Sequence, residues 1–479
     1  MEGKKIYQET CTVMLPEKEQ NALPQGKMFP QYTAALIATL GSFAAGTVMA
    51  WTSPTLPLLT GPSSPLPITP DEGSWVGCLM AVGALCGALP AGIVADTIGR
   101  RRAMQCVALP MLISWVLIIL ASSVGWLYAA RIIAGLGVGA VSVVAPIYVG
   151  EIAASSIRGS LGGFFQMQLT IGILFAYLFG AAVPYLWLNI LSGCVPLIYI
   201  ITLFFIPESP QHLLAKNNRR EAERSLRRLR GAGCYIDEEL RQMQTALDRQ
   251  RAESTTQMEA FKSIFTERAA RKALLIGLGL MLFQQLSGIN AVIFYTVSIF
   301  EAAGSTLSPS VSTIIVGVVQ VVVSFIATLL VDRAGRRVLL FVSASVMALC
   351  LAALGVYFHL LDTDVDVSSY GLIPLASVVL FIVMFSVGFG PIPWTMLGEL
   401  FPAKIKGAAS ALACVENYVL VFTVTKSFQP LVEAVGSAAT FGIFAGICVV
   451  AVLFTVFVVP ETKGKTLEEI QQELAKDQE

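Results

Sequence analysis

Apolar stretches long enough to cross a lipid bilayer recur along most of this 479-residue chain. About 20 apolar residues in helical form span the ~30 Å hydrocarbon layer. Twelve such runs can be drawn, at roughly 32–58, 73–97, 103–123, 125–149, 159–182, 185–206, 273–300, 310–331, 337–361, 370–398, 407–429 and 436–459. With 55% hydrophobic and only 13% charged residues, the composition does not suit a soluble domain. The sequence predicts an all-α, multi-pass membrane protein with twelve spanning helices.

Basic residues fall in every second connection between these runs. These connections hold Arg100 to Arg102, Arg158, the stretch 207–272, Arg333 with Arg336 and Arg337, Lys404 with Lys406, and Lys463 with Lys465. Because cytoplasmic loops are rich in Lys and Arg, both termini are expected in the cytoplasm. Arg131 and Lys426 are exceptions, which snorkelling toward the membrane surface explains. The start of the chain has no apolar core, so no cleavable signal peptide is expected.

Three sequence marks occur twice. Asp96 to Arg101 returns at 332–337, Glu151 with Arg158 returns as Glu399 with Lys406, and Pro207-Glu-Ser returns as Pro460-Glu-Thr. The similar offsets predict two six-helix halves that are parallel repeats about an axis along the membrane normal. The expected divisions are a tail at 1–31, a first half at 32–206, a linker at 207–272, a second half at 273–459 and a tail at 460–479.

The repeated marks place acids and bases together at helix ends on the predicted cytoplasmic side. We call this set the charge latch: Asp96, Arg100, Arg101, Glu151, Arg158, Asp332, Arg336, Arg337, Glu399 and Lys406. Such pairs could interlock the helix ends of each half when this side is closed, and opening would separate them. Exposed ion pairs contribute only about 0–1 kcal/mol each, which suits a contact that must break. The alternative is that these charges only set the topology.

The stretch 207–272 alternates basic and acidic residues with leucines at helical spacing, for example Leu213, Leu226 and Leu229. This pattern predicts short amphipathic helices on the cytoplasmic surface. Their expected role is to hold the two halves together. A solvated linker without that role is the alternative.

A cluster of neutral polar residues interrupts the apolar run 273–300. If the run is one helix, Gln284, Gly288 and Tyr295 lie on one face, with Gln285 about a quarter-turn away. Amides at membrane depth need a partner helix or a watered cavity, because hydrocarbon offers no hydrogen bonds. Contacts between helices are the simpler explanation. The two glutamines with Asn290 favour a site for a neutral, hydroxyl-rich ligand.

Other function classes lack support in the sequence. The net charge is zero, so nothing favours nucleic acid or anionic partners. Gly464-Lys465-Thr466 lacks the upstream glycine of a phosphate loop, because Val459 stands there. The cysteines and the two histidines form no metal or catalytic pattern. No enzyme activity, metal or cofactor is expected.

The chain closely resembles the sugar porter family of the major facilitator superfamily. The resemblance covers nearly all of the chain after residue 30 and rests on an ordered set of motifs. They are Gly99-Arg-Arg, Pro207-Glu-Ser-Pro, Gln284-Gln-Leu-Ser, Gly335-Arg-Arg, Gly390-Pro-Ile-Pro-Trp and Pro460-Glu-Thr-Lys-Gly. Flanking stretches such as Glu72-Gly-Ser-Trp and Val424-Thr-Lys-Ser-Phe look most like insect-type trehalose and hexose facilitators.

The resemblance implies a sugar site between the halves. The matching residues are Gln168, Gln284, Gln285, Asn290, Gln320, Trp394 and Asn417. Amides can donate to and accept from sugar hydroxyls, and an indole offers an apolar face to a pyranose ring. The resemblance also implies a gate formed by Phe294 and Tyr295, with Pro391 and Pro393 permitting helix bending beside the site.

Some positions depart from the family pattern. Ser386 stands where many glucose transporters have Glu, and Tyr418 follows Asn417 where Trp is usual, so sugar choice is open. Gln211 stands where the family has an Arg after Pro-Glu-Ser-Pro. Glu416 is an unexpected acid that could pair with Lys426, pair with an interior amide, or be protonated.

Proton-coupled members of the family carry an Asp in the first helix that pairs with an Arg in the fourth. Here Val48 stands at the matching position, although Arg131 remains. This favours uniport of a neutral sugar by alternating access, with glucose or a similar hexose expected first and trehalose as the alternative. Proton symport through Glu416 and a non-transporting sugar sensor are further alternatives. The expected partners are the sugar and the bilayer, with the plasma membrane as location and the oligomeric state left open.

Overall fold

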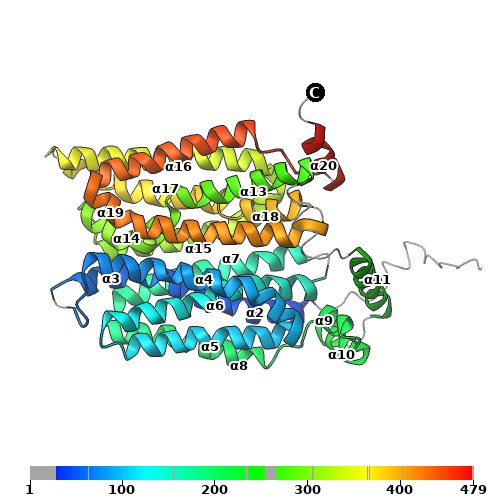
Figure 1. The fold of residues 1–479 in the computed structure, drawn as a ribbon. Helices are drawn as coiled ribbons and strands as arrows, with labels where there is room; N and C mark the ends of the chain where they lie inside the picture. Colours follow the sequence, from blue (N-terminus) through cyan, green and yellow to red (C-terminus); the bar gives the residue numbers. More distant parts are fainter. Residues whose placement is uncertain are drawn as a thin grey trace, which may run out of the picture.

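The computed structural model of this protein is a bundle of long helices that run side by side (Figure 1). The structure describes residues 28–62, 64–154, 157–231, 236–253, 266–304, 307–363, 365, 367–401, 403–465 and 467–476. Within these ranges the chain is almost entirely helical, with no β-strand. The all-α prediction is therefore confirmed.

The first group of helices, coloured blue to teal, lies together in the lower half of Figure 1. It contains α2 (Phe29–Ala50), α3 (Thr52–Thr60), α4 (Pro70–Ile98), α5 (Arg100–Ile119), α6 (Val124–Ile152), α7 (Arg158–Ala182) and α8 (Tyr185–Leu203). α2 and α3 together form one long apolar rod over Phe29–Thr60. The group therefore supplies six segments of spanning length.

The second group, coloured green to red, lies above the first in the same view. It contains α13 (Arg268–Leu286), α14 (Ile289–Ala303), α15 (Pro309–Ala334), α16 (Arg336–Asp362), the short η1 (Ser368–Tyr370), α17 (Ile373–Val387), α18 (Ile392–Leu400) and α19 (Ala403–Phe457). Eleven candidate spans are found among the described residues of the whole chain, and the last runs from Ile405 to Phe457.

The last of these spans contains two membrane crossings. A straight helix of its 55 residues would be about 80 Å long, far more than the ~30 Å hydrocarbon layer. Gly436 interrupts it with φ 84° and ψ 161°, a conformation that favours glycine. Figure 1 shows the chain turning back there, so α19 supplies the predicted eleventh and twelfth crossings.

Two predicted runs are broken near the middle of the molecule. The run 273–300 is two helices, because α13 ends at Leu286 and Gly288 adopts a left-handed φ of 85° before α14 begins. The run 370–398 is also two helices, α17 and α18, with Gly388 to Pro391 between them. The expectation of one continuous helical face from Gln284 to Tyr295 was therefore wrong.

Within the first group, glycines allow α4 and α6 to pack with their backbones almost in contact. A Cβ at Gly135 would lie 2.1 Å from the carbonyl oxygen of Met80, and one at Gly139 would lie 1.9 Å from that of Ala84. No side chain fits at such distances, and small residues are the usual means of close helix packing in membranes. This contact makes the first group a tightly packed unit.

Three short helices lie beyond one end of the bundle: α9 (Pro210–Ala215), α10 (Arg219–Arg230) and α11 (Asp237–Glu253). They share a small apolar core that includes Leu214, Leu226 and Leu240. Arg230 joins them to the first group, because it pairs with Glu239 at 2.6 Å and donates to the carbonyl of Ile152 at 2.9 Å. The predicted linker helices are present, and these contacts attach them to the first group.

The end of the bundle with α9 to α11 also carries the last helix, α20 (Leu467–Lys476) (Figure 1). We call it the linker end, and we call the opposite end, with the connection from α3 to α4, the loop end. α2 starts at the linker end, where Gln31 accepts a hydrogen bond from the backbone of Ala154. The first and last described helices therefore meet the same end.

Candidate functional site

A cavity of about 500 Å³ lies between the two groups of helices. That volume is within the ~300–1,000 Å³ range of small-molecule sites. Its polar lining consists of Ser142, Gln166, Gln284, Gln285, Asn290, Gln320, Trp394, Asn417 and Tyr418. Apolar side chains such as Met49, Val138 and Phe165 form much of the remaining wall. None of these lining residues carries a charge.

Gln284 connects the cavity wall to the broken helix opposite. Its side-chain amide donates to the carbonyl of Phe389 at 2.7 Å and to that of Gly390 at 2.9 Å. These carbonyls lack helical partners because the chain is interrupted between α17 and α18. The side-chain oxygen of Gln284 accepts from Asn417 at 3.1 Å. Gln284 therefore holds three segments of the second group together at the cavity.

The break at Gly288 brings Asn290 beside the glutamines. The amide of Asn290 donates to the side-chain oxygen of Gln285, and Gln285 donates to Gln284 at 3.4 Å. In an unbroken helix, residues five apart would be separated by about 140° around the axis. The irregular turn therefore creates a continuous amide chain that can exchange hydrogen bonds with hydroxyl groups.

Trp394 and Gln320 complete this part of the wall. Trp394 is 45% exposed although it belongs to a spanning segment, and its indole borders the cavity. Pro391 also lines the cavity, whereas Pro393 is buried in α18. Both prolines stand at the start of α18, where the helix resumes after the break. The interrupted segment therefore carries Trp394, the only tryptophan among the lining residues.

On α7, Gln166 lines the cavity, whereas the predicted Gln168 is not among its lining residues. Two residues along a helix turn the side chain by about 200°, so the two glutamines point in nearly opposite directions. Gln168 is buried, at 8% exposure, away from this wall. Both glutamines are visible in the sequence, as Gln166-Met-Gln168. The sequence of one helix does not show which of its faces points toward the cavity, so it could not distinguish them.

Gln166→Ala should lower the rate of ligand uptake several-fold by removing a hydrogen-bonding group from the wall, since one such bond is worth about 0.5–1.5 kcal/mol. Gln168→Ala makes the same chemical change outside the lining and should keep near-normal uptake. Initial rates at matched surface expression compare the two variants. The reverse ranking would contradict the assignment.

The predicted gate residues Phe294 and Tyr295 are buried and do not line the cavity described here. They lie on α14, just beyond the lining residue Ile293 toward the loop end. The hydroxyl of Tyr295 donates to the carbonyl of Thr425 at 3.3 Å, and its ring lies 5.1 Å from that of Phe428. Their role as a gate remains a prediction.

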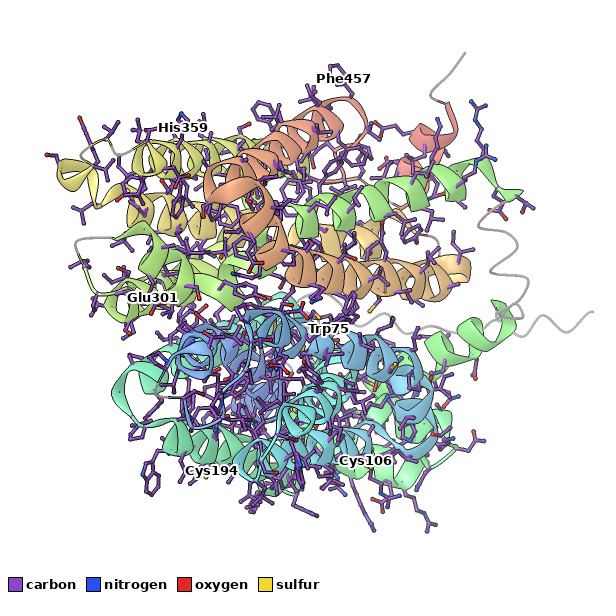
Figure 2. The ribbon with its side chains drawn as sticks, turned by 60° about the vertical axis from the view of Figure 1, so that its left-hand side comes forward. Trp75, Cys106, Cys194, Glu301, His359 and Phe457 are labelled. Carbon is purple, nitrogen blue, oxygen red and sulfur yellow. The ribbon has the colours of Figure 1, made fainter. Side chains whose placement is uncertain are left out.

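At the loop end, Lys426 of α19 binds the first turns of α4. Its ammonium group pairs with Asp71 at 2.6 Å, donates to Ser74 at 2.7 Å and lies 4.5 Å from the centre of the Trp75 ring. Trp75 stands at the boundary between the two groups in Figure 2. Snorkelling was therefore an incomplete explanation of Lys426, which joins the two groups.

Two further contacts join the groups near this end. The hydroxyl of Ser53 accepts from the backbone of Val297 at 3.2 Å, and Tyr177 donates to the carbonyl of Ile293 at 2.9 Å. In the other direction the cavity reaches Gly162, about one turn from the linker-end start of α7. The two groups are thus in contact at the loop end, and the cavity extends from there toward the linker end.

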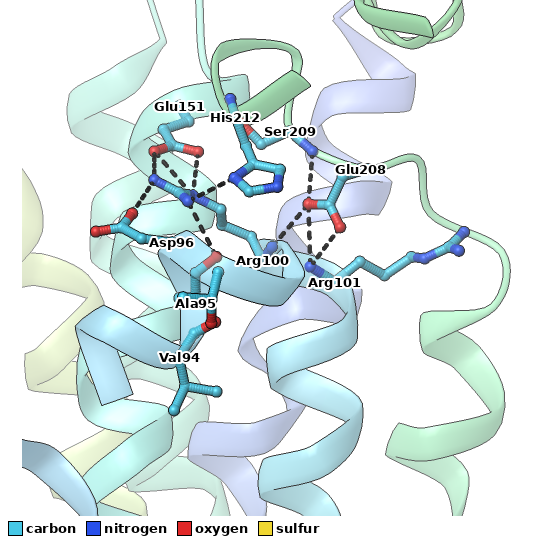
Figure 3. Close-up of polar contacts among 10 residues, drawn as sticks. Val94, Ala95, Asp96, Arg100, Arg101, Glu151, Glu208, Ser209 and His212 are labelled. Atoms are coloured by element: carbon cyan, nitrogen blue, oxygen red, sulfur yellow. Dashed lines mark hydrogen bonds and ion pairs between the residues drawn. The ribbon is translucent and has the colours of Figure 1, made fainter. Parts of the chain in front are cut away.

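At the linker end of the first group, the charge latch forms a compact network (Figure 3). Arg100 pairs with Asp96 and with Glu151, each at 2.8 Å. The carboxylate of Glu208 accepts from the backbone N–H groups of Arg100 and Arg101. Arg158 donates to the carbonyl of Ala153 at 3.5 Å.

The second group repeats the arrangement with matching residues. Arg336 pairs with Glu399 at 3.0 Å, and Glu461 accepts from the backbone N–H groups of Arg336 and Arg337. Lys406 donates to the carbonyl of Gly398 at 3.0 Å. The side chain of Asp332 lies outside the described residues. These pairs are formed in this conformation, and their separation when this end opens stays a prediction.

Glu208 and Glu461 were not assigned to the latch from sequence, although the repeated Pro-Glu marks contained them. Each carboxylate covers the N-terminus of a helix, α5 or α16, where unpaired N–H groups favour an anion. Burial acts to raise the pKa of Glu461, but the N–H groups of Lys463, Arg336 and Arg337 outweigh it, so its pKa lies below the ordinary 4.5. The equivalent positions of Glu208 and Glu461 in the two halves could have identified them from sequence.

A family model described as "Sugar (and other) transporter" matches residues 34–474. This chain belongs to that family of sugar transporters. The match includes every residue that lines the cavity. The fold and the neutral, amide-lined wall of this transporter agree with that membership.

Curated proteins similar to this chain include facilitated trehalose transporters of insects. The facilitated trehalose transporter Tret1 of Bombyx mori is 42% identical over 450 residues, which are 93% of this chain and 87% of that relative. Tret1 of Drosophila mojavensis is 42% identical over 93% of this chain. This chain covers only 52% of the length of the Drosophila mojavensis protein.

Solved structures of the xylose transporter XylE from E. coli share the fold. Its inward open conformation has a TM-score of 0.76 and 26% identity, covering 92% of this chain and 99% of that one. Its partially occluded inward open conformation has a TM-score of 0.75 and also 26% identity. These matches confirm the major facilitator fold.

His212 gives the transporter a pH-dependent contact. Burial lowers the pKa of His212 below the ordinary 6.5, and the nearby Arg100 lowers it further, while Glu208 and Glu151 oppose this. Arg100 donates to Nδ1 of neutral His212 at 2.8 Å, and a proton there would remove that bond. Because the folded protein binds this proton more weakly than the unfolded chain, stability is lost as pH falls from about 6.5 through the lower folded value.

We therefore expect the thermal midpoint of the purified transporter to fall between pH 7 and pH 5. His212→Gln should flatten this dependence, because glutamine carries no titrating group. Differential scanning fluorimetry in detergent measures both proteins. Identical pH profiles for wild type and His212→Gln would show that His212 does not contribute.

Proposed function

We propose that this protein carries out facilitated transport of a neutral sugar and that trehalose is its substrate. The observation that carries the proposal is the amide-rich cavity between the two groups, with no charged residue in its lining. Neutral amides and one exposed indole suit hydroxyl groups and pyranose faces. Relatives named as facilitated trehalose transporters favour trehalose over glucose, which had been the first expectation.

The proposed mechanism is alternating access, in which the two six-helix halves rock about the cavity. In this conformation sugar would exchange with the linker end, while Lys426, Ser53 and Tyr177 keep the loop end closed. The basic connections favour a cytoplasmic linker end, so the structure would face inward. We place the protein in the plasma membrane.

We further propose that no proton is coupled to this transport. Arg131 is fully buried, and it donates to the carbonyl of Val48 at 2.6 Å and to that of Val76 at 2.9 Å. Its guanidinium also lies 5.7 Å from the centre of the Trp51 ring. Among the described residues Arg131 has no ion-pair partner, which supports uniport because no carboxylate there exchanges a proton.

The test is uptake of radiolabelled trehalose and glucose into oocytes at outside pH 5.5 and 7.5, with and without a protonophore. We expect saturable trehalose uptake that is unaffected by the protonophore. Uptake that collapses with the protonophore would overturn uniport. Uptake of glucose alone would overturn trehalose, and uptake of neither sugar would refute the transport proposal.

Removing the loop-end contact should shift the transporter toward its other conformation. Lys426→Ala deletes an ion pair, a hydrogen bond and a cation–π contact between the halves, together about 1–3 kcal/mol. We expect increased labelling of a cysteine introduced at Ser53 by an impermeant reagent added from outside. Lys463→Ala, an exposed lysine at the linker end, should leave the labelling unchanged. Equal labelling in all three proteins would contradict the gate.

A further inference from the structure

Two arginines from different elements converge on the end of α8. Arg101, in the first turn of α5, donates to the carbonyl of Ile206 at 3.3 Å. Arg228 of α10 donates to the neighbouring carbonyl of Phe205 at 2.6 Å. The end of a helix carries only about half a negative charge, so these carbonyls do not balance two guanidinium groups.

No acid balances them either. Among the described residues, Arg101, Arg102 and Arg228 form no ion pair, whereas Arg224, Arg227 and Arg230 on the same linker helix pair with Glu221, Glu223 and Glu239. The nearby Glu208 accepts from the backbone of Arg100, Arg101 and Ser209, and the Arg101 side chain extends away from it in Figure 3. We call Arg101, Arg102 and Arg228 the basic rim.

The basic rim lies at the expected level of the membrane surface. The span of α8 ends at Leu203, and the next two residues, Phe204 and Phe205, are 64% and 65% exposed. Exposed phenylalanine rings beside arginines suit the boundary between lipid headgroups and acyl chains, where apolar side chains insert and basic ones face the headgroups. Since Arg228 binds the carbonyl of Phe205, its charge stands at that same level.

We infer that the basic rim binds the headgroup of an anionic phospholipid. The phosphate oxygens would accept hydrogen bonds from the guanidinium groups, with the acyl chains beside Phe204 and Phe205. A bound lipid would join α5, α8 and the linker helix α10, and so attach the linker to the membrane surface. This inference goes beyond sugar transport and does not depend on which sugar is carried.

The second group offers an internal comparison. Arg337 corresponds to Arg101, because it also donates to carbonyls at a helix end, those of Thr455 and Val456. Phe457 beside them is 80% exposed and projects from the outer surface in Figure 2. Val338 stands where the first group has Arg102, and among the described residues only Arg337 donates to these two carbonyls. One arginine instead of three predicts weaker lipid binding at this second position.

The experiment titrates the purified full-length protein in detergent with phosphatidylinositol and counts retained lipid by native mass spectrometry. Each interfacial arginine is worth about fivefold in affinity, so Arg228→Gln should weaken binding about fivefold and Arg101→Gln/Arg228→Gln roughly 25-fold. Arg219→Gln is the matched control. It removes the same charge from α10 nine residues earlier, on the opposite face of the helix. Arg337→Gln should change total binding less than Arg228→Gln.

Phosphatidylcholine should not replace phosphatidylinositol, and inositol phosphate at equal concentration should not compete. Competition by the soluble headgroup would mean that the rim binds a free phosphate, which would overturn the lipid assignment. Equal binding by wild type, Arg228→Gln and Arg219→Gln would overturn the site. If the double variant does not fold, Arg228→Gln decides alone, because Arg228 is exposed and loses one hydrogen bond.

Discussion

Gln284→Ala is expected to lower sugar uptake about tenfold or more, since leaving buried polar groups unpaired costs about 1–3 kcal/mol each. The variant removes the donor for the carbonyls of Phe389 and Gly390 and the acceptor for Asn417. It therefore loses a cavity amide and also frees the interrupted segment that carries Trp394. Both effects act on the wall of the proposed sugar site.

The measurement is initial uptake of radiolabelled sugar over a range of concentrations, normalised to surface protein. Loss of sugar contacts raises KM, whereas loosening of the α17–α18 break lowers the maximal rate, so we expect both constants to change. Gln168→Ala controls for removal of a buried membrane glutamine outside the cavity. Normal uptake by Gln284→Ala would exclude Gln284 from the site.

Gly139→Leu is expected to abolish the folded protein. Its Cβ would lie 1.9 Å from the carbonyl oxygen of Ala84, and the neighbouring contacts are backbone atoms. Overpacking against movable side chains costs about 1–3 kcal/mol, and a rigid helix backbone cannot relax as a side chain does. α4 and α6 would have to separate along their closest contact.

Fluorescence-detected size-exclusion chromatography of a tagged protein measures the outcome. We expect the monodisperse peak to fall to about a tenth of wild type or less, which requires a destabilisation comparable to the ~5–15 kcal/mol stability of a folded protein. Gly446→Leu is the matched control, since no atom lies within 4 Å of a Cβ built there. A normal peak for Gly139→Leu would show that the α4–α6 contact is not as close as described.

The positions of the spanning helices could be predicted because hydrophobicity over some 20 residues is a local property. The break at Gly288 was missed, although polar residues mark its position, because such residues also occur in continuous helices. Near Gly388 the prolines predicted bending, but not that the helix stops at Val387 and restarts at Ile392. The break between α17 and α18 leaves backbone carbonyls without helical partners, and Gln284 of α13 donates hydrogen bonds to two of them. A pattern along one segment does not contain that information.

The candidate site shows the same limit. Its amide and indole residue types could be predicted from sequence, but the choice between Gln166 and Gln168 depends on the rotation of α7 about its axis. The charge latch was predicted as sets of acids and bases, yet Glu208 and His212 enter only when the chain after α8 folds back to Arg100. The partner of Lys426 likewise lies 355 positions away in sequence.

The glycine turn inside α19 restricts where this molecule can be modified. The chain reverses at Gly436 within a single helical element, so the last two crossings have no loop between them at the loop end. An epitope tag or protease site inserted there has no connecting segment to occupy, and it would separate helices that one residue now joins. The connection from α16 to α17, which contains η1, offers ten residues for the same purpose. Antibody accessibility at the loop end should therefore be engineered at that connection.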